Sequence, residues 1–204
     1  MNFSRPAPCR PIFSGTSPRR PFVLTTVLII FMALLGPFQG YAEEKGLREY
    51  PVPEHGVLQL DVPQSWKDEV PESTDGRPPT ITFRPGDGND FVMMITPLWE
   101  PAEEKKFDTD EKIHALIKED WKAFSKEARE SKPVVHKLSG TGSHGFYYTA
   151  TDKASKKGEY KYLLRAGVKV GDLLLSVTIL SHKKGSKAFK DGLHLLGEAR
   201  QKND

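Results

Sequence analysis

A glycine-rich segment of this chain has the spacing of a dinucleotide-binding loop. Residues Gly140 to Gly145 read G-x-G-x-x-G. That chemistry requires a strand before the glycines and a helix N-terminus after them, because the amides at the start of the helix bind the pyrophosphate. Here Phe146 to Thr151 follows, and its aromatic and β-branched residues are typical of a strand. We therefore expect a glycine-rich turn, and no cofactor is predicted.

Two further patterns are compatible with metal binding. Pro85 to Asp90 contains Asp87, Asn89 and Asp90, but it lacks the distal glutamate of a calcium loop, so a hairpin connection is expected. The six histidines do not have the H-x-x-x-H or H-E-x-x-H spacing of a zinc site. The sequence therefore predicts no metal ligand, although it leaves open a site assembled from distant residues.

No nucleophile motif of the G-x-S-x-G or S-x-x-K type occurs, and no catalytic residue is predicted. Cys9 is the only cysteine and precedes the long apolar run, so thiol chemistry is not expected after removal of a leader. Trp66, Trp99, His136 and His144 remain as candidates for surface or cleft contacts. Trp99 precedes Pro101 at the end of a predicted strand and is the least explained of the three tryptophans.

The first 42 residues have the pattern of a secretory signal peptide. They contain four arginines and no acidic residue, then the apolar run from Phe22 to Leu35, then Gly40-Tyr41-Ala42 as a small-x-small exit. We expect cleavage after Ala42 and a periplasmic or otherwise exported protein with no stable membrane insertion. The alternative is an uncleaved N-terminal anchor, for which Phe22 to Phe38 is short. Arg19-Arg20 leaves open whether export uses the Sec or the twin-arginine route.

Charge after residue 42 is nearly balanced, with 26 basic and 27 acidic residues. The basic character of the whole chain therefore comes from the leader, and nucleic acid is not an expected partner. About 160 residues remain, which suits one domain with a single core. We predict an extended N-terminal lead at 43–54 and one domain at 55–204, with no conclusion on the oligomeric state.

The pattern along this domain predicts three strands, a helix, four strands and a final helix. Strands are expected at 57–62, 80–84, 91–95, 134–138, 146–151, 159–168 and 173–181. Helices are expected at 108–130, with a capping box of Asp108 and Glu111, and at 186–200. Gly171-Asp172 is expected to join the last two strands as a tight hairpin. The predicted fold is α+β: a mostly antiparallel six- or seven-stranded sheet with a helix on each face, an α/β/α sandwich.

This layout resembles the PsbP-like fold of extrinsic photosystem proteins and of exported proteins of the DcrB type. The similar pieces are Leu58 to Lys67, with an opening strand and a P-x-x-W turn, together with the Gly171-Asp172 hairpin and the amphipathic C-terminal helix. The resemblance implies a non-enzymatic binding or assembly module. No binding residue of the family can be matched position by position.

We therefore expect an exported soluble binding or assembly module that contacts another envelope protein. One alternative is a protein that binds a small ligand or cation in a cleft between the sheet and a helix, lined by Trp66, Trp99, Tyr147 or Tyr160. The other is an exported hydrolase with an unrecognised site near His136 and His144.

The leader generates the first prediction. N-terminal sequencing of the exported form should give Glu43 as the first residue, and the protein should fractionate away from membranes. A protein that retains Arg19 and Arg20 and sediments with membranes would show that the apolar run is an anchor instead.

Overall fold

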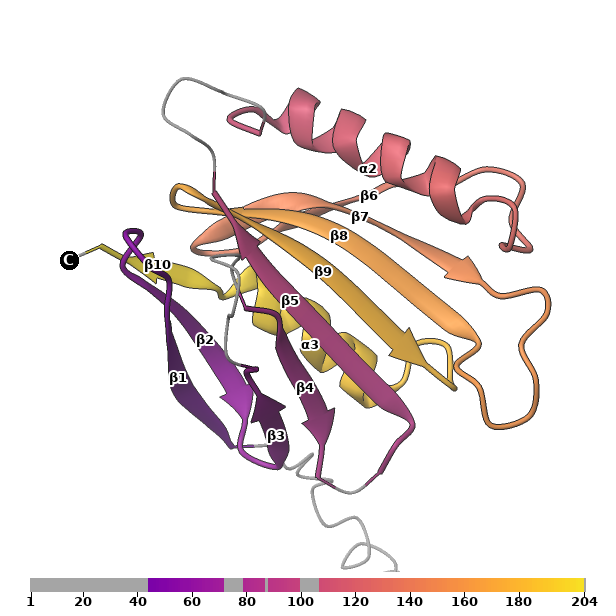
Figure 1. Cartoon of the computed structure of the whole chain (residues 1–204), viewed down its shortest axis with the longest axis horizontal. Coiled ribbons are helices and arrows are strands. Elements are labelled where there is room, and N and C mark those ends of the chain that lie inside the picture. Colours follow the sequence, from indigo (N-terminus) through magenta and orange to yellow (C-terminus); the bar gives the residue numbers. More distant parts are fainter. Residues whose placement is uncertain (1–43, 72–78, 87, 100–106, 204) are drawn as a thin grey trace, which may run out of the picture. The chain divides into compact units, whose positions relative to one another are not determined.

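The structure, a computed structural model, describes residues 44–71, 79–86, 88–99 and 107–203. The predicted signal peptide lies outside these residues. The described chain forms ten strands and two helices (Figure 1). The strands are β1 Lys45–Pro51, β2 Val57–Pro63, β3 Trp66–Glu69, β4 Ile81–Pro85, β5 Phe91–Leu98, β6 His136–Ser139, β7 Ser143–Thr151, β8 Tyr162–Val170, β9 Leu173–Ser181 and β10 Arg200–Lys202. The helices are α2 Asp110–Phe124 and α3 Lys187–Gly197.

Seven strands form one antiparallel sheet in the order β3-β4-β5-β9-β8-β7-β6. The predicted hairpin between β8 and β9 is present, with Val170 opposite Leu173 and Gly171 at a φ of 59°. A positive φ of this kind favours glycine, as a two-residue turn requires. The predicted α+β fold with a largely antiparallel sheet is thus confirmed.

A second sheet, in the order β1-β2-β10, was not predicted. The segment 43–54 is extended as expected, but Lys45–Pro51 pairs with β2 along its whole length and belongs to the folded unit. The final helix ends at Gly197 rather than Arg200, and Arg200–Lys202 pairs with β2 on its other side. Both outer strands are highly charged, so their sequences do not show the partner that holds them. Strand β3, at the edge of the large sheet, was likewise predicted as loop.

The two helices pack on opposite faces of the large sheet (Figure 1). Helix α2 lies over β7 and β8, where Ile113 and Ile117 approach Gly167. Helix α3 packs against β2, β5 and β9, and a side chain at Gly192 would press on Ile179 and Met93. Glycine therefore allows close approach at both helix–sheet contacts.

Helix α2 is shorter than predicted and begins with a different cap. Thr109 is the N-cap, and its hydroxyl accepts a hydrogen bond from the amide of Lys112. Asp108 instead forms an ion pair with the Lys112 ammonium at 2.7 Å. The helix ends at Phe124, and Leu116 is exposed although its spacing placed it on the apolar face. The core face of α2 is narrower, comprising Ile113, Ile117 and Trp121.

The G-x-G-x-x-G segment is the β6–β7 hairpin, as predicted for a turn between strands. Its glycines allow close contact with the C-terminal end of α3. A Cβ atom at Gly140 would lie 1.7 Å from the carbonyl oxygen of Gly197, and one at Gly142 would lie 2.8 Å from that of Ala199. The hydroxyl of Ser143 donates to the carbonyl oxygens of Leu196 and Gly197, which end the helix. This segment is therefore a packing motif.

The second prediction tests that contact. Gly140→Ala should destabilise the fold by about 2 kcal/mol or more, because the new methyl group overlaps backbone that cannot move without shifting α3. Gly88→Ala is the control, since a Cβ atom there would come no closer than 3.9 Å to another part of the chain, the Asp90 amide nitrogen, and should change stability by less than about 0.5 kcal/mol. Chemical denaturation of both variants measures the difference. Equal stability of the two variants would contradict the packing role.

Candidate functional site

The two tryptophans proposed as contacts lie in different environments. Trp66 is 3% exposed and packs between Phe83 and Phe91, with ring centroids 6.5 and 5.1 Å away. Trp99 is half-buried at the end of β5, and its indole lies 4.9 Å from the imidazole of His55. Trp66 is thus mainly a core residue, whereas Trp99 belongs to a surface cluster.

The two candidate histidines lie on opposite faces of the sheet. His136 pairs with Tyr147 and stacks on its ring, and His144 pairs with Ser139 on the adjoining strand. Successive residues of a strand point to alternate faces, so positions 144 and 147 of β7 point in opposite directions. His144 shares the α2 face, where its Nε2 lies 3.5 Å from Asp110. The two imidazoles therefore do not converge on one site.

Trp99 is joined to a polar cluster that sequence reasoning missed. Nδ1 of His55, in the β1–β2 turn, lies 2.9 Å from Oδ2 of Asp172 in the β8–β9 hairpin. Gln201 of β10 donates to the His55 carbonyl oxygen at 2.7 Å and accepts from the Asp172 amide at 2.8 Å. The cluster therefore links the tips of two sheets. Its members are dispersed from residue 55 to residue 201, and no local pattern identifies them.

Electrostatics in this cluster favour the ionised carboxyl of Asp172. Partial burial raises the pKa of Asp172, but the hydrogen bonds with His55 and Gln201 outweigh it, and the net pKa is lowered. Asp110 near His144 behaves similarly, because the hydrogen bond from Lys137 lowers its pKa. Both carboxylates act as ion-pair partners between elements.

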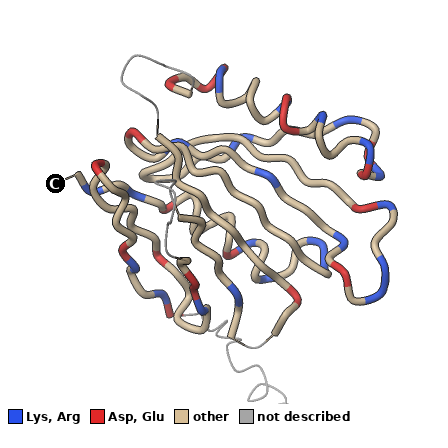
Figure 2. The backbone as a smooth tube through the Cα atoms, viewed as in Figure 1, with Lys and Arg blue, Asp and Glu red and all other residues tan. Residues whose placement is uncertain are grey.

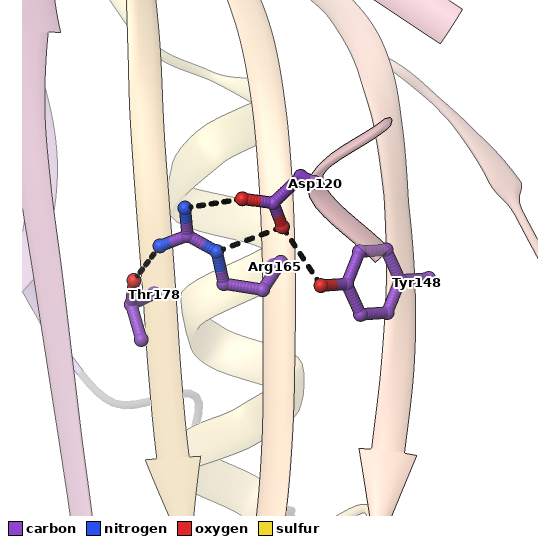
Figure 3. Close-up of polar contacts among 4 residues, drawn as sticks. All are labelled: Asp120, Tyr148, Arg165 and Thr178. Atoms are coloured by element: carbon purple, nitrogen blue, oxygen red, sulfur yellow. Dashed lines mark hydrogen bonds and ion pairs between the residues drawn. The ribbon is translucent and has the colours of Figure 1, made fainter. Parts of the chain in front are cut away.

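A shielded network of charged and polar side chains lies between α2 and the sheet (Figure 3). The guanidinium of Arg165 on β8 donates to both carboxylate oxygens of Asp120 on α2, at 2.8 and 3.1 Å. It also bonds the hydroxyl of Thr178 on β9, and the Tyr148 hydroxyl donates to Asp120 at 2.7 Å. About four-fifths of each charged side chain is shielded, with 22% of Arg165 and 21% of Asp120 exposed.

The network keeps its protonation fixed. Burial lowers the pKa of Arg165, but the bonds and charge of Asp120 outweigh it and raise the pKa overall. Burial also raises the pKa of the Tyr148 hydroxyl, and its bond to Asp120 raises it further. A charged arginine and a neutral tyrosine are therefore maintained around one carboxylate, an arrangement that joins three strands to α2.

A cavity of about 310 Å³ lies next to this network, at the C-terminal end of α2. Phe124, Leu163 and Leu180 give it apolar walls, and Tyr160 and Lys161 lie at its rim. Tyr160, one of the predicted cleft residues, stacks on His182 with ring centroids 4.6 Å apart. A second hollow of about 280 Å³ borders Trp66 and the start of α3.

The described part of the chain contains no group of three His, Cys, Asp or Glu side chains placed to hold an ion. The possible calcium loop is the β4–β5 connection, and its Asp87 lies outside the described residues. No helix among the described residues is long and apolar enough to span a bilayer.

Comparison with known proteins identifies the fold. No family model matches the sequence, and no curated protein matches it. The structure is similar to the solution structure of cyanobacterial PsbP (CyanoP) from Synechocystis sp. PCC 6803, with a TM-score of 0.50 and 13% identity over 83% of this chain and 99% of that chain. A crystal structure from Bacteroides thetaiotaomicron VPI-5482 has a TM-score of 0.45 and 13% identity over 72% of this chain and 46% of that one. The chain has a PsbP-like fold, as the sequence predicted.

The third prediction concerns the shielded ion pair. Asp120→Ala should destabilise the protein by about 3 kcal/mol or more, because the Arg165 charge stays shielded without its partner. Glu119→Ala on the same helix removes an exposed pair with Lys122 and should cost less than about 0.5 kcal/mol. Urea denaturation of both variants provides the comparison. Similar losses would mean that the Asp120 pair has no special role.

The fourth prediction concerns pH. The lowered pKa of Asp172 means that its stabilisation is complete above the unfolded value of about 3.9 and is lost as pH falls through the folded value. When the pH falls from about 5 to about 2.5, the melting temperature of the Asp172→Asn variant should therefore fall less than that of the unchanged protein. Thermal melts of both proteins across this pH range test the direction of the difference. A steeper loss in the variant would contradict the assigned pKa direction.

Proposed function

We propose that this chain is an exported binding or assembly module that acts through contacts with another envelope protein. The observation that carries the proposal is the PsbP-like architecture, which is similar to that of CyanoP along nearly the whole length of that protein. The N-terminal pattern of arginines, apolar run and Gly40-Tyr41-Ala42 exit supports export.

The polar groups of the described residues support the same proposal. Asp120 with Arg165, Asp172 with His55, and Arg48 with Asp68 each join separate elements of the fold. In each pair, the two ionisable side chains bind each other and hold the sheets and α2 together. The hydrolase alternative placed an unrecognised site near His136 and His144, and these two lie on opposite faces of the sheet. His144 lies 3.5 Å from Asp110, whose other carboxylate oxygen pairs with Lys137.

Small-ligand carriage, the other alternative, is compatible with the cavity that Tyr160 borders and with the hollow that Trp66 borders. A melting-temperature screen of lipids, metabolites and metal salts tests it directly. A ligand that raises the melting temperature, and loses this effect in Leu180→Trp, would favour carriage over protein contact.

The fifth prediction tests the leading proposal in the source cell. A photo-crosslinkable residue placed at exposed positions on different sides of the full-length protein should give a discrete adduct with one envelope protein from at least one position. The same residue in place of buried Leu164 is the background control. Absence of adducts from every exposed position, together with turnover of a small molecule by the purified protein, would overturn the proposal.

A further inference from the structure

Three loops that are distant in sequence meet at one end of the large sheet. They are residues 125–132 after α2, residues 152–161 between β7 and β8, and residues 182–185 after β9. The Lys153 amide donates to the Glu127 carbonyl oxygen at 3.0 Å, which joins the first loop to the second. Tyr160 stacks on His182, which joins the second to the third. We call these three loops the basic end.

The basic end carries a concentrated positive charge. Its three loops contain nine lysines and arginines against four acidic residues, whereas the chain after residue 42 is nearly neutral. In Figure 2, Lys and Arg residues lie along these loops at the right of the view. All but one of the nine cationic residues are exposed, the exception being half-buried Lys161. The field at this end therefore differs from that of the whole chain.

Three of the four acidic residues of the basic end accept hydrogen bonds in local structure, and the fourth, Glu127, is exposed beside the cavity. Glu130 accepts from the amide and hydroxyl of Thr151 at 2.8 and 2.7 Å. Asp152 accepts from the amide of Ala154, and Glu159 from that of Lys156. Among the described residues, Lys183 is the only cation of these loops in an ion pair, at 3.5 Å from Asp90. The Lys153 ammonium donates to the Lys126 carbonyl oxygen, Lys161 lies over the Tyr162 ring, and Lys184 acts electrostatically on Glu130. Lys156 and Lys157 are exposed and can meet an external anion.

The apolar cavity opens at this same end. Phe124, Leu163 and Leu180 are half-buried and form its walls, while Glu127, Asp152 and Lys161 from the loops border it. The large exposed apolar residues of the described chain all lie outside the three loops. Apolar surface is thus recessed behind a charged rim, and a projecting side chain can reach it where a flat bilayer surface cannot.

From these observations we propose that the basic end binds an acidic segment of a partner protein, with one aromatic or branched aliphatic side chain of that segment in the cavity. The inference rests on the proposed function and specifies its surface. Lysines supply charge complementarity and orient the segment, and burial of the anchor supplies affinity.

The test uses the purified folded protein and a short labelled peptide with a central phenylalanine between runs of glutamate. Fluorescence anisotropy should show binding that weakens at least ~10-fold from 0.1 to 1 M salt, as the screening length falls from about 10 to 3 Å. Replacing the phenylalanine with serine should weaken binding by a similar factor. Absence of binding at low salt, or indifference to the phenylalanine, would overturn the proposal.

Two charge-reversal variants locate the surface. Changing Lys156, Lys157 and Lys184 to Glu together should weaken peptide binding at least ~10-fold. Changing Lys45, Lys67 and Lys202 to Glu gives the same net charge, but these exposed lysines lie outside the basic end, so the effect should stay under ~2-fold. If the two sets have equal effects, the interaction depends on net charge alone, and the assignment of the peptide to the basic end is overturned.

A second pair of variants tests the cavity. Leu180→Trp narrows it and should remove the advantage of phenylalanine over serine. Met94→Trp is the control, because Met94 is half-buried on the same face of the neighbouring strand and does not line the cavity. Vesicles containing anionic phosphatidylglycerol provide the competing surface. Vesicle binding that depends on the three basic-end lysines, without the phenylalanine preference, would mean that this end binds membranes.

The crosslinking experiment separates failure of this inference from failure of the proposed function. An adduct from Lys157 in which the captured region is acidic supports both. Adducts only from Lys67, on edge strand β3 outside the three loops, would overturn the basic end as the contact surface and leave the binding module intact. No adducts at all would count against both.

Discussion

The charges of Arg165 and Asp120 lie between helix α2 and the sheet, where either would be costly without the other. Their two-point contact fixes α2 along β8, and the bonds to Thr178 and Tyr148 extend the same constraint to β9 and β7. The apolar contacts of Ile113 and Ile117 with Gly167 are not directional, so they allow α2 some movement along the sheet. A bidentate ion pair requires a defined geometry of its two partners and therefore fixes the helix position. The place where α2 ends, and therefore the loop that follows it, depends on this pair.

A comparable constraint holds the C-terminal part of the fold. The β6–β7 hairpin reaches the end of α3 because its glycines lack side chains, and Ser143 supplies a hydroxyl to the last helical carbonyl groups. The chain then turns into β10 and pairs with β2, and Gln201 reaches the His55–Asp172 contact. A motif shared with nucleotide-binding proteins thus serves here to bring backbone segments together, because the elements around it are different.

Much of the fold was accessible from the sequence because its signals are local. Alternating apolar residues and Gly171-Asp172 predicted β9 and its hairpin, and helical spacing predicted both helices, although the buried face of α2 is narrower than the spacing indicates. Strands β1 and β10 were missed because their outward residues are charged and their stability comes from pairing with β2. The His55–Trp99 cluster was missed for a related reason, since its members come from four separate elements and no spacing relates them.

The basic end shows why net charge was a poor guide to surface chemistry. Nearly equal totals of acidic and basic residues do not say where the charges lie. In the β7–β8 loop, turns require acceptors for backbone amides. Asp152 and Glu159 fill that role, and their charges are held close to the backbone while lysines extend outward. Local hydrogen bonding thereby separates the two signs of charge in space. Loops with an excess of exposed lysines thus lie beside an apolar cavity whose own rim carries Glu127, Asp152 and Lys161. Such a surface distinguishes partners by charge and by shape together.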